Sequence, residues 1–97
     1  MQVQAVGIPW YRREDWETLK RLFADADKLH DAYDQWLVSA EKLAKHLKAK
    51  GMIVEQVPIN PDEFANWCGI RRKPLDAKAR NDFANEFVAR KHFYGNR

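Results

Sequence analysis

Hydrophobic residues recur every three or four positions between residues 29 and 51, which is the spacing of one face of an α-helix. The apolar seam consists of Leu29, Tyr33, Trp36, Ala40, Leu43 and Leu47, flanked by Ala32, Leu37 and Ala44. Basic side chains in the last turns and Gly51 directly after them are typical of a helix C-terminus. The pattern therefore predicts a long amphipathic helix over residues 29–51, with Asp25 or Asp27 as its cap.

A shorter helix is predicted ahead of it, over residues 14–24. Its apolar positions recur at helical spacing, and acidic residues fall in its first turn, where they complement the helix dipole. Those apolar residues are Trp16, Leu19, Leu22 and Phe23. Residues 2–8 are either a short strand or a disordered lead-in, and Pro9 is expected to end either one.

Residues 52–59 are short and rich in β-branched side chains, so they predict a strand. Pro58 cannot donate a ladder hydrogen bond, which favours an edge position. A lone strand leaves its backbone polar groups unpaired, so this strand needs a partner. Either residues 2–8 supply it, or the same strand of a second copy does, which would make a homodimer.

The C-terminal half carries the clearest helix signals. Asn60 and Pro61 suit the cap and first position of a helix over residues 61–71, and Glu63 stands three residues after the cap. Pro74 is expected to break that helix, and Asp76 to cap a last one reaching about His92. The residues expected to face inward are Phe64, Trp67, Cys68 and Ile70, and then Ala77, Phe83, Ala84, Phe87 and Val88.

These elements predict a mainly α (α+β) fold of about four helices around one long central helix, with one short β element between helices 2 and 3. The 97 residues suit a single globular domain, 1–97, in which residues 1–9 are a short strand or disordered. The formal net charge of +3 is ordinary for a soluble domain. No apolar run is long enough to span a membrane and no signal sequence is evident, so we expect no membrane partner and a cytoplasmic protein.

Arg80 is the least expected residue, because helical spacing places it within the apolar face of the last helix. A buried guanidinium must be paired or must hold an anion. The favoured interpretation lays its stem on the core, while its head group pairs with a structural carboxylate or reaches out past the helix end. The alternative is an anion or ligand site at the start of that helix.

Basic residues gather in the C-terminal half, near Trp67 in the sequence. Basic side chains neutralise phosphates and aromatic rings stack on bases, so these residues form a candidate nucleic-acid patch. The alternative interpretation is an ordinary solvated rim of charged side chains. The patch consists of Arg71, Arg72, Lys73, Lys78, Arg90 and Lys91. Trp10 and Tyr11 are a candidate partner-binding patch, unless they fold back over the core.

The sequence gives little support for a catalytic site or a metal site. Cys68 is the only cysteine, so an intrachain disulfide and a Cys-type zinc site are excluded, and we favour a buried thiol over a nucleophile paired with a histidine. His30 lies among aspartates, but their spacing fits no metal motif. We therefore expect no catalytic residues, no metal and no cofactor.

The sequence thus predicts a small, non-enzymatic protein-interaction or structural module that self-associates, with itself or another protein as its partner. Two observations favour a homodimer: the strand lacks a convincing partner, and the long helix exceeds what the remaining core needs. The alternative is a nucleic-acid-binding accessory protein that uses the basic C-terminal patch.

Overall fold

The computed structural model describes residues 4–94, and side chains up to His92. The elements in chain order are β1 (Ala5–Trp10), α1 (Trp16–Leu22), α2 (Tyr33–Ala49), β2 (Ile53–Pro58), α3 (Pro61–Arg71) and α4 (Ala77–Ala89). Short 3₁₀ turns, Arg13–Asp15 and Ala26–Lys28, flank α1, and a π-helical turn, Arg90–Tyr94, follows α4. The predicted mainly helical α+β fold is confirmed.

β1 and β2 form a parallel two-stranded sheet, in register from Ala5 opposite Ile53 to Trp10 opposite Pro58. The N-terminal segment is therefore the partner that β2 needs, and pairing within one chain removes one of the two arguments for a homodimer. The predicted β2 is confirmed to within a residue at each end. Residues 2 and 3 of the predicted N-terminal strand lie outside the described residues.

Pro9 does not end β1, contrary to expectation, and the direction of its backbone explains why. The amide of Ile53 donates to the Gln4 carbonyl at 2.9 Å and that of Ile59 to the Trp10 carbonyl at 3.0 Å. Backbone groups point alternately to either side of a strand, so even-numbered residues of β1 face β2 and odd-numbered ones face outward. Pro9 thus sits at an outward position, where its missing N–H breaks no ladder bond.

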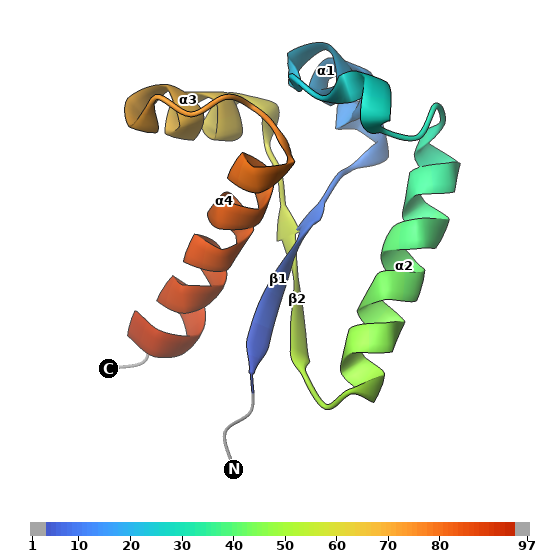
Figure 1. Cartoon of the computed structure of the whole chain (residues 1–97), viewed down its shortest axis with the longest axis vertical. Coiled ribbons are helices and arrows are strands. Elements are labelled where there is room, and N and C mark those ends of the chain that lie inside the picture. The colour runs from blue at the N-terminus through green and yellow to red at the C-terminus, as the bar shows by residue number, and fades with distance from the viewer. Residues whose placement is uncertain (1–3, 95–97) are drawn as a thin grey trace.

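The sheet lies between α2 and α4, and α1 and α3 cross the end at which both strands finish (Figure 1). Gly7 brings α4 close to the sheet, because a Cβ there would lie only 2.6 Å from the Ala84 carbonyl oxygen. Ala84 and Val88 pack on Val57 from that side. On the other side the rings of Trp36, from α2, and Trp10 lie 5.3 Å apart.

Helix α2 begins at Tyr33 and not near Leu29, so it is shorter than predicted. Neither Asp25 nor Asp27 caps it; instead the Gln35 side chain accepts from the Ala32 amide at 3.3 Å. Asp25 is held elsewhere by Arg80. The aspartate-rich residues before Tyr33 are weak helix formers and remain outside the helix.

The local capping predictions hold. The side chains of Asn60 and Asp76 accept from the amides of Glu63 and Ala79, each at 3.0 Å. Gly51 has the expected positive φ, +87°. Helix α3 ends at Arg71, ahead of Pro74, because Arg72 adopts a left-handed conformation with φ 55°. Several residues expected to face inward are substantially exposed, namely Leu22, Leu43, Ile70 and Phe87.

Candidate interaction surface at the sheet edges

A sheet of two strands has an unpaired edge on each of them, and each edge here opens into a groove. The groove along β1 lies between α2 and α4 and encloses about 230 Å³. Its strand and aromatic lining is Ile8, Pro9, Tyr11 and Trp36, and its helical walls are Ser39, Ala40 and Leu43 of α2 and Ala77, Arg80 and Asn81 of α4. Arg80, which is buried, is the only charged residue among them.

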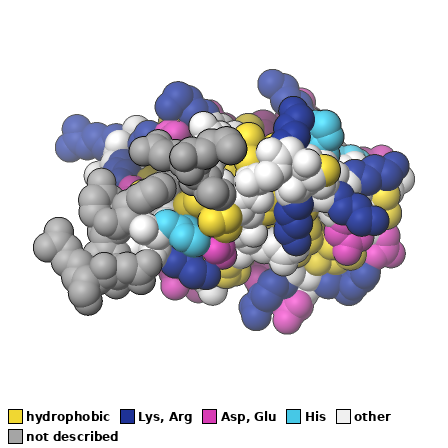
Figure 2. All heavy atoms as spheres, turned by 90° about the horizontal axis from the view of Figure 1, so that it is seen from below, with side chains coloured by type: hydrophobic (Ala, Val, Ile, Leu, Met, Phe, Trp, Pro, Cys, Tyr) yellow, Lys and Arg dark blue, Asp and Glu magenta, His cyan; other side chains and the backbone are white. Residues whose placement is uncertain are grey.

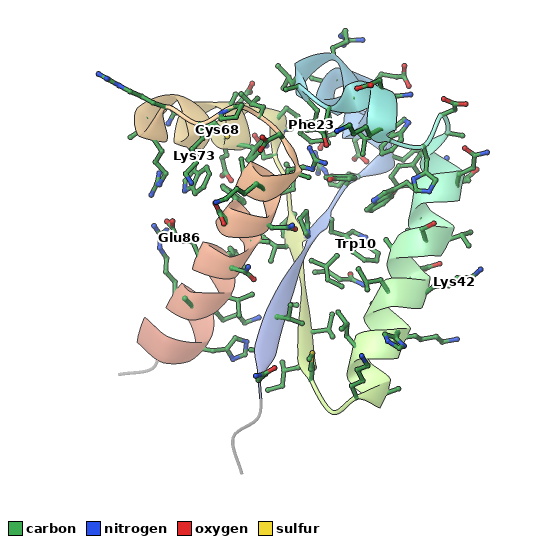
Figure 3. All side chains as sticks on the ribbon, in the orientation of Figure 1. Trp10, Phe23, Lys42, Cys68, Lys73 and Glu86 are labelled. Carbon is green, nitrogen blue, oxygen red and sulfur yellow. The ribbon has the colours of Figure 1, made fainter. Side chains whose placement is uncertain are left out.

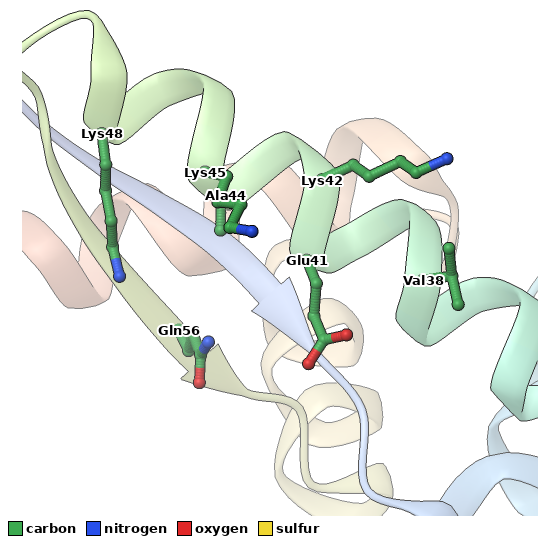
Figure 4. A pocket seen from close by; sticks show the side chains of 7 residues that line it. All are labelled: Val38, Glu41, Lys42, Ala44, Lys45, Lys48 and Gln56. Carbon is green, nitrogen blue, oxygen red and sulfur yellow. The ribbon is translucent and has the colours of Figure 1, made fainter.

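The groove along β2 is larger, about 430 Å³, and has a different chemistry. Gln56 faces the neighbouring flank of α2, from which charged side chains extend over the groove (Figure 4). The α2 lining residues are Val38, Glu41, Lys42, Ala44, Lys45 and Lys48. No ion pair involves these lysines within the part of the chain that the structure describes.

Helix α2 therefore presents two unlike flanks to solvent. Leu43, 47% exposed, lies over the β1 edge, and Val38, 52% exposed, lies over the β2 edge. The two residues are similar in exposure and belong to the same helix. They differ in their surroundings, which are uncharged beside Leu43 and rich in lysine beside Val38.

Arg80 closes one end of the β1 groove and is paired, as the favoured interpretation expects. Its two terminal nitrogens donate to the two carboxylate oxygens of Asp25 at 2.8 and 2.9 Å. The guanidinium also lies 4.3 Å from the centre of the Phe23 ring. This geometry anchors α4 to the loop that precedes α2, and it occupies the face of Arg80 that an anion would need.

The pKa directions in this cluster agree with the pairing. Burial alone would lower the pKa of Arg80, but the hydrogen bonds and charge of Asp25 and the hydroxyl of Tyr11 raise it overall. Hydrogen bonds from Arg80 lower the pKa of Asp25. Burial raises the pKa of Tyr11 to about 12. The cluster is therefore an ion pair beside a neutral phenol at neutral pH.

Most of the basic C-terminal patch is paired with carboxylates. Arg71 and Arg90 contact Glu86, Lys73 and Lys78 contact Asp82, and Lys91 contacts Glu55. Lys73 and Glu86 lie on the side of α4 away from α2 (Figure 3). Seen from below, acidic side chains lie among the basic ones (Figure 2). Of the six patch residues, Arg72 alone has no carboxylate partner among the described residues.

Trp10 and Tyr11 fold back over the core. Tyr11 is 4% exposed, and its ring centre lies 4.6 Å from that of Trp36. The Tyr33 hydroxyl donates to the Tyr11 carbonyl at 2.8 Å, which fixes the backbone at this point. Of the two expectations for this pair, burial is therefore the one that the geometry matches.

The remaining candidates lie apart from the grooves. Cys68 is fully buried, and burial raises the pKa of its thiol, so it carries little thiolate at neutral pH. His30 is exposed, and its Nε2 lies 3.2 Å from the Ser39 hydroxyl. Within residues 4–94, no three His, Cys, Asp or Glu side chains gather as a metal site would require.

Sequence reasoning missed both grooves and the partner of Arg80. Leu43 was expected in the apolar seam of the long helix and Val38 was not singled out, and only the placement of the sheet shows that the two flank opposite edges. Asp25 is one of several acidic residues in its segment, and nothing in the sequence distinguishes it as the partner of Arg80.

Comparison with protein-family models, with curated proteins and with solved structures found no match to this chain. Among the described residues, no helix combines the length and the apolar character that crossing a membrane would need.

Proposed function

We propose that this chain is a non-enzymatic protein-interaction module that self-associates as a homodimer through the open edge of β1. The observation that carries the proposal is the groove between α2 and α4 beside Ile8 and Pro9 of β1, whose one charged lining residue, Arg80, is buried and paired with Asp25. A free edge is a template for a further strand, and charged residues are depleted at the centres of protein interfaces. We further propose that it acts in the cytoplasm, since the single cysteine needs no oxidising compartment.

A second copy suits this edge better than it suits the β2 edge. Two β1 edges brought together meet with one charged lining residue each, Arg80, which is buried and neutralised by Asp25 within its own copy. Two β2 edges would bring Lys45 and Lys48 of each copy toward those of the other, and the chain is already net positive, +3. Association of like copies at the β2 edge is therefore penalised by repulsion.

The test compares two substitutions on the same helix, Leu43→Glu and Val38→Glu. Both residues are about half exposed, so neither variant should unfold the protein. We expect the unmodified protein to dimerise in a dilution series followed by light scattering. Leu43→Glu should raise the dissociation constant at least about tenfold, which corresponds to about 1.4 kcal/mol, and Val38→Glu should leave it within about twofold.

A monomer at every concentration would overturn the proposal. Equal weakening by both substitutions would retain self-association but remove the β1 edge as its location. Circular dichroism of both variants provides the control for folding.

Nucleic-acid binding remains the second candidate, on the basis of the exposed Arg72 and the cations beside Trp67. The Arg71 guanidinium lies 4.4 Å from the Trp67 ring centre, and the Lys73 ammonium lies 5.8 Å from it. Binding of labelled duplex and single-stranded DNA at low and near-physiological salt tests it. A loss on charge reversal at Arg72 and Lys73 that exceeds the loss at Lys45 and Lys48 would support it, and absence of binding at low salt would exclude it.

A further inference from the structure

We infer that the groove along β2 binds an extended acidic peptide of a partner protein, which adds to the open edge of β2 as a third strand. This interaction goes beyond the proposed self-association and does not depend on it, because it uses the other edge of the sheet. The outward backbone groups of β2, the unpaired lysines of α2 and the size of the groove support it.

The edge of β2 that faces away from β1 offers backbone groups to a further strand. The amides of Ile53 and Ile59 donate toward β1, so the odd-numbered residues of β2 face that strand. Backbone groups alternate along a strand, so those of Gln56 face away from β1. Gln56 is exposed and lines the groove, and among the residues that the structure describes only β1 pairs with β2. An extended peptide along this edge can therefore exchange hydrogen bonds with the N–H and C=O of Gln56.

The lysines on the flank of α2 beside this edge lack carboxylate partners. Lys42, Lys45 and Lys48 line the groove, and none of them forms an ion pair within the described part of the chain. Lys48 extends from α2 toward the strand that carries Gln56 (Figure 4). Glu41 is the one acidic residue of the lining, so the groove keeps a surplus of positive charge. An acidic ligand would complement it.

A peptide fits these groups better than a nucleic acid does. Phosphate oxygens would neutralise the lysines, but they only accept hydrogen bonds and leave the outward carbonyl of Gln56 without a donor. A peptide strand supplies a donor and an acceptor together. A second copy of this chain is disfavoured, because the lysines that attract an acidic strand repel a chain of net charge +3. The groove volume, about 430 Å³, is also within the range of ligand clefts, about 300–1,000 Å³.

The two faces of the sheet predict the pattern of the peptide. Side chains of an added strand alternate between the faces. The Gln56 side chain is on the α2 face, where it lines the groove, whereas Val57 packs against α4 on the opposite face. Peptide residues on the α2 face would meet Lys45 and Lys48 and should be acidic. Those on the other face would lie beside Ile53, which is 42% exposed, and should be apolar. The expected ligand is therefore a segment in which acidic and apolar residues alternate.

Two fluorescein-labelled peptides of equal composition test this pattern. One alternates glutamate with valine over six residues, the length of β2, and the other carries the same glutamates as one block followed by the valines. Fluorescence anisotropy at near-physiological salt should show that the alternating peptide binds at least about tenfold more tightly. Equal affinities would show attraction by charge alone and would overturn the added strand.

Charge reversal in the protein tests the location. Lys45→Glu with Lys48→Glu should weaken binding of the alternating peptide at least about tenfold. Lys28→Glu with Lys50→Glu is the matched control, because both lysines are exposed, neither lines the groove and the net charge changes equally. The control should stay within about twofold of the unmodified protein, since salt screens distant charges. Equal losses from the two double variants would overturn the groove as the binding site.

Gln56→Pro tests the backbone pairing, because it removes an N–H that faces away from β1. Proline already occupies outward positions at Pro9 and Pro58, so circular dichroism should show a folded protein. Its affinity for the alternating peptide should fall at least about tenfold, whereas Gln56→Ala, which keeps the N–H, should stay within about twofold. Equal affinities of these two variants would contradict an added strand.

Two further outcomes would overturn the inference. The first is an unmodified protein that does not bind the alternating peptide, a result that would leave self-association at β1 intact. The second is single-stranded DNA that displaces the peptide and itself loses affinity on Lys45→Glu with Lys48→Glu, which would assign the groove to nucleic acid.

Discussion

The two edges of the sheet differ in burial and in chemistry. Each carries one proline at an outward position, Pro9 on β1 and Pro58 on β2, but the outward Gly7 of β1 is buried whereas the outward Gln56 of β2 is exposed. The one charged residue that lines the β1 groove, Arg80, is buried and paired with Asp25, whereas lysines and Glu41 of α2 line the β2 groove. Charged side chains at an edge strand discourage the addition of further strands.

If the chain self-associates as proposed, this difference would give a closed assembly. If both edges accepted strands, copies would add at each end and the sheet would grow without limit. Lysines over the β2 edge alone would stop growth at two copies.

The largest effect is expected from Asp25→Asn, which removes the partner of Arg80 at the end of the β1 groove. The Arg80 side chain is 7% exposed, so the variant leaves a buried cation without its counter-charge. Breaking such a pair costs about 3 kcal/mol or more. Urea denaturation should measure this loss in the free energy of unfolding.

Asp82→Asn is the matched control, because Asp82 pairs with two lysines at a more exposed site, with 36% of its side chain accessible. It should cost less than about 1 kcal/mol. Equal losses from the two variants would show that burial of Arg80 is not what makes its pair important.

Gly7→Ala is expected to have the next largest effect, because it acts on the contact between β1 and α4. The added methyl group would lie 2.6 Å from a backbone oxygen of Ala84, which cannot rotate away. Overpacking of this kind costs about 1–3 kcal/mol. Thermal denaturation should show the loss, and the proposed dimer should weaken as the α4 wall of the groove shifts.

Gly69→Ala provides the contrasting case. Nothing lies within 4 Å of a Cβ at this position in α3. Replacing a helical glycine with alanine should therefore raise the free energy of unfolding, by up to about 1 kcal/mol. A loss of stability here would contradict the view that the geometry at Gly7 is what forbids a side chain.

Lowering the pH should weaken the Arg80–Asp25 pair beside the β1 groove without any substitution. The pKa of Asp25 is lowered in the folded state by hydrogen bonds from Arg80, so the stabilisation is complete above the unfolded pKa, about 4. It is lost as the pH falls from there through the lower, folded pKa. The difference in urea midpoint between the unmodified protein and Asp25→Asn should therefore shrink between about pH 5 and pH 2. A constant difference over that range would contradict the assignment.

The smallest change in folding stability is expected when the lysines over the β2 edge are replaced. Surface substitutions such as Lys45→Val with Lys48→Val should change the free energy of unfolding by about 0.5 kcal/mol or less. They should nevertheless open the second edge, so light scattering should detect species larger than a dimer. Lys28→Val is the control, because Lys28 is exposed and does not line the β2 groove. Larger species from Lys28→Val would show that the loss of charge, and not the exposed β2 edge, causes association.

The sequence by itself determined the features that depend on neighbouring residues. The capping by Asn60 and Asp76, the positive φ of Gly51 and the span of α3 were all predicted, because each depends on bonds within a few residues. The position of Arg80 within an apolar face also indicated that its guanidinium, if buried, must be paired or must hold an anion.

Only the tertiary structure decided which segments meet. Asp25 and Arg80 are 55 residues apart, and no local rule distinguishes Asp25 from the other acids of its segment. The pair also removed Asp25 as a cap for α2, which begins at Tyr33. The parallel register of β1 and β2 decided that Pro9 points outward and that Leu43 and Val38 flank different edges. Side-chain periodicity defines a face of an element, but only packing determines what that face meets.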